Sequence, residues 1–286
     1  MPFLFLFSSK KIKAATNHKE SDNKKCPNLI GIFFYFYAMN IKHYLDSTYL
    51  KTAAQAGLTE EDNNTIVRGF IQEAIEEGFK LIMIRPDKVK IAREMINAAK
   101  SKLLIGTVIS FPEGTNSIEE KLAEAHKAIE DGVDELDYVC NFEAFKMGNS
   151  ELVKNEIYKG TRLAFEHHKI AKWIIEVAAL TDAQIIQISA LIKNVIITDF
   201  KEECYANVFV KSSTGFYKTE NNQPNGATVS SIILMLENAS PLPVKAAGGV
   251  RTYDEAVEMI RLGVKRIGTS AAKTIANGEI ATSNYY

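Results

Sequence analysis

The sequence predicts an α/β protein whose main part is a single (β/α)8 TIM-barrel domain. Short apolar runs of strand length alternate with amphipathic stretches of helical periodicity, and eight such runs follow one another after residue 39. Residues 39–286 provide about 31 residues for each of eight βα units, which is the size that this architecture requires. We therefore expect residues 39–286 to form one closed barrel.

The eight strand candidates are rich in β-branched and other apolar residues. They are residues 43–48, 80–84, 103–109, 135–139, 172–177, 207–211, 243–247 and 265–269. Residues 194–200 are also rich in β-branched residues. We interpret them as the end of a long fifth helix, because a ninth strand would prevent an eight-stranded barrel from closing.

The helices between these strands carry their own start and stop signals. Three capping boxes begin at Ser117, Thr181 and Thr252, each with Glu or Gln three residues later. Gly78 and Gly263 follow apolar periodic stretches and are expected to end two helices.

Residues 1–38 differ in amino-acid composition from the rest of the chain. Two short apolar runs flank a polar, basic stretch, and neither run approaches the ~20 residues that span a bilayer. The charge follows the first apolar run, which is the wrong order for a signal peptide. Met39 then resembles a natural chain start. We interpret residues 1–38 as an extension that is disordered or not part of the native chain; a targeting segment and a structural extension are the alternatives.

Composition excludes several classes of protein. The 34 Lys and Arg balance 35 Asp and Glu, so no surplus of positive charge indicates binding to nucleic acid or to a membrane surface. The three cysteines share no CxxC spacing and are odd in number, which argues against a disulfide framework. A reducing compartment, the cytoplasm, is therefore the expected location.

Two lysines stand in otherwise apolar strands. Lys211 ends the sixth strand and Lys245 lies in the seventh, so both point toward the same end of the barrel. Either lysine alone could extend its amine to solvent. As a pair, two nearby ammonium groups repel each other, which lowers the pKa of one amine and favours a Schiff-base nucleophile.

Two carboxylates accompany the lysines. Asp137 in the fourth strand could relay a proton or simply pair with a lysine. Asp46 in the first strand, two residues before Thr48, could bind a substrate hydroxyl or orient a lysine. No His, Asp and Glu set has the spacing of metal ligands, so we expect neither a metal nor another cofactor. Cys140 has no histidine to activate it and is expected to be a packed thiol.

Glycine-rich loops follow the last strands. Gly248 and Gly249 come after the seventh strand, Gly268 and Ser270 come at the end of the eighth, and Gly215 follows Lys211. In (β/α)8 barrels, the loops after strands seven and eight commonly bind phosphate through backbone N–H groups. The pattern therefore predicts a phosphorylated substrate.

These residues, in this order, resemble the deoxyribose-phosphate aldolase family of class I aldolases. The block Phe-Val-Lys211-Ser-Ser-Thr-Gly215-Phe is the most specific, and Val-Lys245-Ala-Ala-Gly-Gly-Val-Arg-Thr252 is nearly as specific. The resemblance extends from Tyr44 to about Ser270. Departures occur in the first-strand motif, in Ile-Arg85-Pro after the second strand, and at Phe216, where some members have a lysine.

The resemblance implies a role for each matching residue. Lys211 would form the Schiff base, Lys245 would lower its pKa, and Asp137 would relay protons. The substrate-binding positions would be Asp46, Thr48, Gly215, Gly248, Gly249, Gly268 and Ser270. Tyr286, at the C-terminus, would assist proton transfer if it folds back to the site.

The implied reaction is the reversible cleavage of 2-deoxy-D-ribose 5-phosphate to D-glyceraldehyde 3-phosphate and acetaldehyde, in deoxyribonucleoside catabolism. The resemblance also implies a homodimer. The alternatives are another Schiff-base or sugar-phosphate barrel enzyme, similar to transaldolases or isomerases, and a non-catalytic sugar-phosphate sensor. Isomerisation would need a Glu or His base at a strand end, for which Glu176 is the candidate.

Overall fold

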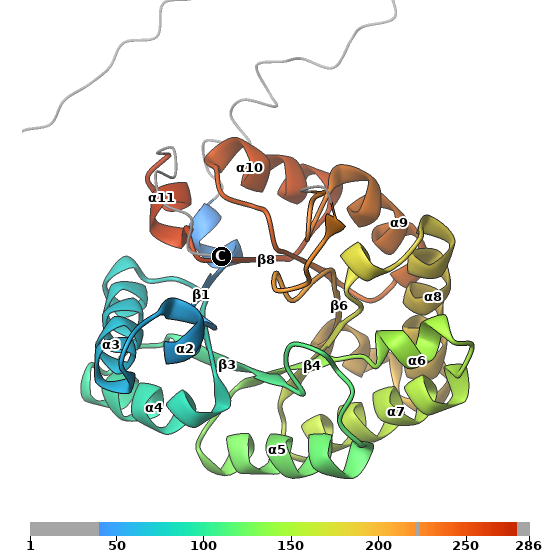
Figure 1. The fold of residues 1–286 in the computed structure, drawn as a ribbon, viewed down its shortest axis with the longest axis horizontal. Helices are drawn as coiled ribbons and strands as arrows, with labels where there is room; N and C mark the ends of the chain where they lie inside the picture. Colours follow the sequence, from blue (N-terminus) through green and yellow to red (C-terminus); the bar gives the residue numbers. More distant parts are fainter. Residues whose placement is uncertain (1–39, 221–222, 279–286) are drawn as a thin grey trace, which may run out of the picture. The chain divides into compact units, whose positions relative to one another are not determined.

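The computed structural model describes residues 40–220 and 223–278, and these residues form a closed barrel of parallel strands surrounded by helices (Figure 1). Neighbouring strands in sequence are neighbours in the barrel, and β8 pairs with β1. The expected extension, residues 1–38, and Tyr286 lie outside the described residues.

The eight predicted strands are all present. They are β1 (Leu45–Thr48), β2 (Leu81–Ile84), β3 (Leu104–Ile109), β4 (Glu135–Val139), β5 (Ile170–Ile174), β6 (Val208–Lys211), β7 (Val244–Ala247) and β8 (Arg266–Thr269). Seven of them match the predicted runs to within two residues at either end. The fifth was placed wrongly: it begins two residues earlier and ends three residues earlier than predicted. Its early end is explained by Glu176, whose φ of 58° is incompatible with a strand and leads into a 3₁₀ turn, Val177–Ala179.

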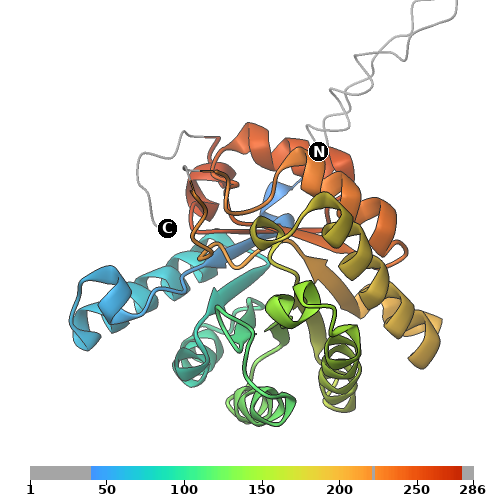
Figure 2. The ribbon, with the colours of Figure 1, turned by 45° about the vertical axis from the view of Figure 1, so that its right-hand side comes forward.

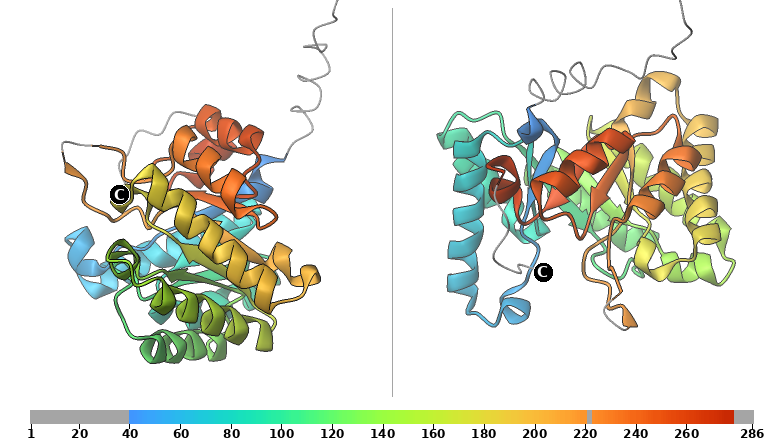
Figure 3. Two further views of the ribbon diagram at one scale, coloured as in Figure 1. Left: turned by 90° about the vertical axis from the view of Figure 1, so that its right-hand side faces the viewer. Right: turned by 90° about the horizontal axis from the view of Figure 1, so that it is seen from above.

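The helices cover the outside of the barrel (Figures 1 and 2). They are α2 (Ala53–Ala56), α3 (Glu60–Glu77), α4 (Val89–Ala98), α5 (Ile118–Glu130), α6 (Phe142–Lys146), α7 (Ser150–Glu166), α8 (Asp182–Asp199), α9 (Val229–Ala239), α10 (Tyr253–Leu262) and α11 (Ala272–Ala276). Helices α8 and α9 pack side by side on one flank (Figure 3). Residues 194–199 are the last turns of α8, so the interpretation as helix rather than a ninth strand is confirmed.

The predicted helix boundaries are also confirmed. All three capping boxes form, with Ser117, Thr181 and Thr252 as N-caps of α5, α8 and α10. Gly78 and Gly263 are C-caps with positive φ, the backbone conformation that glycine adopts most easily. The capping boxes thus begin three helices, and the two glycines end α3 and α10 a few residues before the next strand begins.

Alternation along each strand separates the barrel interior from the layer under the helices. In β4 and β5, Tyr138 and Trp173 face outward and stack with ring centroids 4.8 Å apart. Gly160 of α7 lies against them, and a Cβ at this position would come within 2.8 Å of the Trp173 ring. The alternate positions, including Asp137 and Lys172, therefore point into the barrel, where they form the site.

Candidate active site

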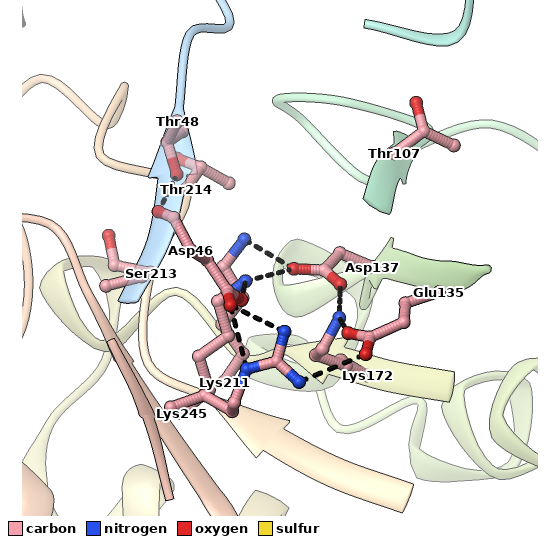
Figure 4. A network of polar contacts seen from close by, with 12 residues as sticks. Asp46, Thr48, Thr107, Glu135, Asp137, Lys172, Lys211, Ser213, Thr214 and Lys245 are labelled. Atoms are coloured by element: carbon pink, nitrogen blue, oxygen red, sulfur yellow. Dashed lines mark hydrogen bonds and ion pairs between the residues drawn. The ribbon is translucent and has the colours of Figure 1, made fainter. Parts of the chain in front are cut away.

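The three residues predicted to carry the chemistry meet inside the barrel (Figure 4). Lys211 Nζ lies 2.9 Å from Asp137 Oδ2, and Lys245 Nζ lies 3.0 Å from the same oxygen. The two lysines are register partners on neighbouring strands β6 and β7, which explains why their amines converge. One carboxylate oxygen thus bridges both amines.

These residues belong to a larger charge network in the barrel interior. Its members are buried side chains from six strands: Asp46, Glu135, Asp137, Lys172, Lys211, Lys245 and Arg266. Lys172 Nζ lies 2.5 Å from Asp137 Oδ1 and 2.6 Å from Glu135 Oε2. Arg266 joins Glu135, at 3.0 Å, to Asp46, at 2.5 Å. The network therefore links β1 with β4, β5, β6, β7 and β8 across the barrel interior.

Lys172, Glu135 and Arg266 are not among the site residues predicted from the sequence. The signal that identified Lys211 was available for Lys172, which also stands in an apolar strand, directly after Ala171. Glu135 lies two residues before Asp137 and shares its face of β4. Arg266 lies on β8, and its contacts with Asp46 on β1 and Glu135 on β4 depend on closure of the barrel.

The network holds one more base than it holds acids, and this surplus falls on Lys211. Four bases face three acids when every group is ionised. Burial lowers the pKa of Lys211 to about 8; Asp137 opposes this change, and the charge of Lys245 reinforces it. Roughly a tenth of Lys211 is therefore a neutral amine at pH 7, which is far more than for a lysine with the ordinary pKa of 10.5, and a nucleophile requires this neutral form.

The partners of Lys211 keep their charges. Burial acts against the ionised form of Lys245, but Asp137 and Asp46 outweigh it and raise the pKa of this lysine. Burial likewise opposes ionisation of Asp137, but Lys172, Lys211 and Lys245 hold the pKa of its carboxyl well below its ordinary value. Lys211 is thus the member of this trio poised to lose its proton.

Asp46 contacts Lys245 inside the barrel and is not exposed at the open end. Its side chain is fully buried, and Oδ2 lies 2.6 Å from Lys245 Nζ. Thr48 is also buried and donates a hydrogen bond to the Asp46 carbonyl oxygen. Of the two roles considered for Asp46, orienting a lysine is the one for which the geometry provides a direct contact.

The predicted phosphate-binding positions lie on three adjacent strands or the loops that follow them. Gly215, Gly248 and Gly249 have φ values of 80°, 78° and 85°. Ser270 directly follows β8. Gly268 lies inside β8, and a Cβ there would meet Lys245 Cε at 3.2 Å. The absence of a side chain at Gly268 therefore makes room for the lysine.

A pocket opens beside the network at the carboxyl ends of β3 to β6. It is lined by Pro112, Glu113, Thr115, Phe142, Glu143, Glu176, Thr214, Phe216, Tyr217 and Lys218.

Cys140 is fully buried, and burial raises the pKa of its thiol, as expected for a packed cysteine. Within the described ranges, no group of three His, Cys, Asp or Glu could hold a metal ion.

A buried lysine of lowered pKa, bridged to a second lysine by a carboxylate inside a (β/α)8 barrel, defines a Schiff-base aldolase. No family model matches the chain. It is 40% identical to the deoxyribose-phosphate aldolase of Thermococcus gammatolerans over 241 residues, which cover 84% of this chain and 96% of the relative. It is 36% identical to that of Streptococcus gordonii over 248 residues, covering 86% of this chain and all of the relative.

Solved structures give the same result. An aldolase named QR15 matches with a TM-score of 0.69 and 30% identity, over 84% of this chain and 95% of that one. The deoxyribose-phosphate aldolase of Aeropyrum pernix, described as a tetramer, matches with a TM-score of 0.67 and 27% identity, over 83% and 89%. The chain belongs to the deoxyribose-phosphate aldolase family, and it is a class I aldolase, which is a carbon–carbon lyase. The expectation drawn from the sequence is confirmed.

Proposed function

We propose that the protein cleaves 2-deoxy-D-ribose 5-phosphate reversibly to D-glyceraldehyde 3-phosphate and acetaldehyde, with Lys211 as the nucleophile. The observation that carries this proposal is the buried Lys211 amine, with a pKa of about 8, at 2.9 Å from Asp137. The family membership of the chain supports the same substrate.

The steps follow from the chemistry of a neutral amine. Lys211 Nζ attacks the C1 aldehyde of the open-chain sugar, and loss of water gives a protonated imine. The C3 hydroxyl loses its proton as the C2–C3 bond breaks. C3 leaves as the aldehyde carbon of D-glyceraldehyde 3-phosphate, and the electron pair of the broken bond passes through C2 to the imine, which becomes an enamine on the lysine. Protonation of the enamine carbon and hydrolysis then release acetaldehyde and restore the amine.

Asp137 is the group that we assign to proton transfer. Its Oδ2 atom contacts both Lys211 and Lys245, so a proton can pass between the two amines through one carboxylate oxygen. Lys245 keeps its charge and acts in two ways: it disfavours protonation of Lys211, and it supplies a proton near the reacting carbon. Asp46 holds Lys245 in place for both.

We propose that the substrate phosphate binds to the loops after β6, β7 and β8. Gly215, Gly248 and Gly249 bring the backbone close to the ligand there, and Ser270 adds a hydroxyl. Gly268 contributes by admitting Lys245. Binding the remote phosphate orients the carbon chain over Lys211, which lowers the barrier to attack. Thr48, and Tyr286 at the C-terminus, remain predicted contacts.

Borohydride trapping tests the assignment. The protein is incubated with acetaldehyde or 2-deoxyribose 5-phosphate, reduced, digested and mapped by mass spectrometry. An adduct on Lys211, absent in Lys211→Ala, is the expected result. An adduct on Lys245 would reverse the roles of the two lysines. A folded protein that binds the sugar phosphate, forms no adduct and releases no acetaldehyde would contradict the aldolase mechanism and favour an isomerase or a sensor.

Assembly and location are part of the proposal. One solved relative is described as a tetramer, and we propose a homodimer for this chain, to be measured by light scattering. Within the part of the chain that the structure describes, no helix combines the length and apolar character needed to cross a membrane. We propose a cytoplasmic location, which fractionation of cells would test.

A further inference from the structure

Glu176 is a buried acid that the mechanism does not use. It lies two residues after the end of β5, is 1% exposed and lines the pocket. Its φ of 58° is in the left-handed region, which is unfavourable for a residue with a side chain. A strained and buried glutamate persists only where its contacts hold it in place.

Those contacts come from the loop that follows the nucleophile. Glu176 Oε1 lies 2.6 Å from Ser213 Oγ. Glu176 Oε2 accepts hydrogen bonds from the Thr214 backbone N–H, at 3.1 Å, and from the Thr214 hydroxyl. The carboxyl group of Glu176 therefore contacts Ser213 and Thr214, which are the second and third residues after Lys211.

Counting protons at Ser213 shows which form of Glu176 fits. Ser213 Oγ accepts a hydrogen bond from Gly215 N–H at 3.0 Å and lies 2.7 Å from the Asn225 carbonyl oxygen. A hydroxyl has one proton to donate and two lone pairs. Because the carbonyl can only accept, that proton goes to Asn225. The remaining contact, to Glu176 Oε1, is then satisfied only if Glu176 donates.

The Ser213 contacts lead on to the proposed phosphate site. Asn225 Nδ2 donates to the Gly215 carbonyl oxygen at 3.1 Å. The next residue, Gly226, packs directly on Gly248: a Cβ at Gly226 would come within 2.5 Å of the Gly248 backbone. The position of Ser213 thus fixes both Gly215 and Gly248 relative to the loop between them.

We propose that Glu176 is a positioning residue that acts as the neutral acid, donating a hydrogen bond to Ser213 and thereby holding Gly215 and Gly248 in place to bind the substrate phosphate. The inference rests on the proposed function for the phosphate. The protonation state of Glu176 itself rests only on the hydrogen-bond geometry.

The charges around Glu176 are consistent with a neutral carboxyl group. Burial raises its pKa, against the opposing effects of the hydrogen bonds from Thr214 and of the charge on Lys211. The other charged groups that line the pocket are two acids and one base: Glu113, Glu143 and Lys218. The two acids disfavour a third negative charge, and Lys218 favours it.

The protonation state is measured first, without reference to activity. The carboxyl carbons of glutamate are labelled with ¹³C, and the signal of Glu176 is identified as the one missing from Glu176→Gln. We expect a chemical shift typical of the protonated acid at pH 7, moving to that of the carboxylate at higher pH. A carboxylate shift at pH 7 would overturn the proposal.

Kinetics then test the positioning role with two variants. Gln can donate to Ser213 and accept from Thr214, as the neutral acid does, so Glu176→Gln should keep KM for the sugar phosphate within about twofold. Glu176→Leu removes both contacts and should raise that KM about tenfold or more. Turnover of 2-deoxyribose, which carries no phosphate, should change much less than turnover of the sugar phosphate in Glu176→Leu.

The controls separate this inference from the proposed function. Glu156, another buried glutamate, pairs with Lys121 at 2.8 Å; Glu156→Gln leaves that lysine without its anion and should lower the melting temperature, whereas Glu176→Gln should not. Equal weakening by Gln and Leu, or failure of Glu176→Gln to fold, would contradict the positioning role. Absence of aldolase activity in the unmodified protein would instead contradict the proposed function and leave the ¹³C result valid.

Discussion

At the scale of single residues, the reactivity of Lys211 follows from an imbalance among its neighbours. The charge network contains one more base than acids, so one base gains from losing its proton. Lys211 is that base, because it has one carboxylate partner, Asp137, whereas Lys245 has two and Lys172 has two. The network thus favours the neutral amine of Lys211 and the charged form of Lys245.

Replacing Lys245 should therefore shift the pH profile. In Lys245→Leu, Lys211 loses a repelling charge and keeps Asp137, so its pKa should rise from about 8 toward the ordinary value. We expect lower turnover and a rate that appears only at pH values about one unit higher or more, measured as kcat/KM against pH. Lys265→Leu, at an exposed position just before β8, is the control. An unchanged profile would contradict this role of Lys245.

The same charge count predicts losses of stability of different size for the two partners of one ion pair. Glu135→Gln increases the surplus of positive charge and should cost about 3–5 kcal/mol of unfolding free energy, as expected for a buried charge left unpaired. Lys172→Met removes the surplus and should cost less. Urea denaturation of both variants measures the difference. A greater loss for Lys172→Met would contradict the count.

At the scale of elements, the sequence was sufficient for the barrel but not for its interior. Capping boxes and C-cap glycines act locally, so the helix boundaries could be predicted. The early end of β5 could not, because it depends on Glu176 binding a loop that lies 37 residues further along the chain. Lys211, Lys245 and Asp137 were predicted, whereas the contacts of Arg266 with Asp46 and Glu135 depend on how β8 closes the barrel against β1.

Gly268 and Gly106 provide a matched pair of strand glycines. A Cβ at Gly268 would press on Lys245 Cε at 3.2 Å, whereas one at Gly106 would meet Met83 Cε at 2.5 Å, away from the lysines. Both alanine variants should lose stability, by about 1–3 kcal/mol. Turnover should fall only in Gly268→Ala, through a lower kcat. A raised KM with unchanged kcat would instead assign Gly268 to phosphate binding.

At the scale of the whole molecule, the lowered pKa of Lys211 should make the free energy of unfolding depend on pH. The folded pKa of Lys211, about 8, lies below its ordinary value of 10.5, so the unfolded chain binds more protons between these values. The resulting destabilisation is complete below about pH 8 and disappears as the pH rises toward 10.5. The protein therefore carries a stability cost at neutral pH that comes from its nucleophile.

A neutral residue of similar size should remove that cost. Lys211→Met is expected to be inactive and more stable than the unmodified protein, by on the order of 2–3 kcal/mol at pH 7, with a gain that shrinks above pH 8. Denaturant unfolding at pH 6, 7 and 9.5 measures this. Equal or lower stability at pH 7 would show that the ammonium form of Lys211 is not strained in the folded protein.

The bond between Asp46 and Arg266 joins residues 220 positions apart, and it forms only when β8 pairs with β1. A chain that has not yet formed its last strand holds Lys211 as an ordinary, solvated ammonium group, with little tendency to react with aldehydes. Because closure of the barrel both buries the amine and assembles its partners, the nucleophile becomes reactive only in a finished molecule. We therefore expect incomplete chains to react with aldehydes at Lys211 much more slowly than the folded protein does.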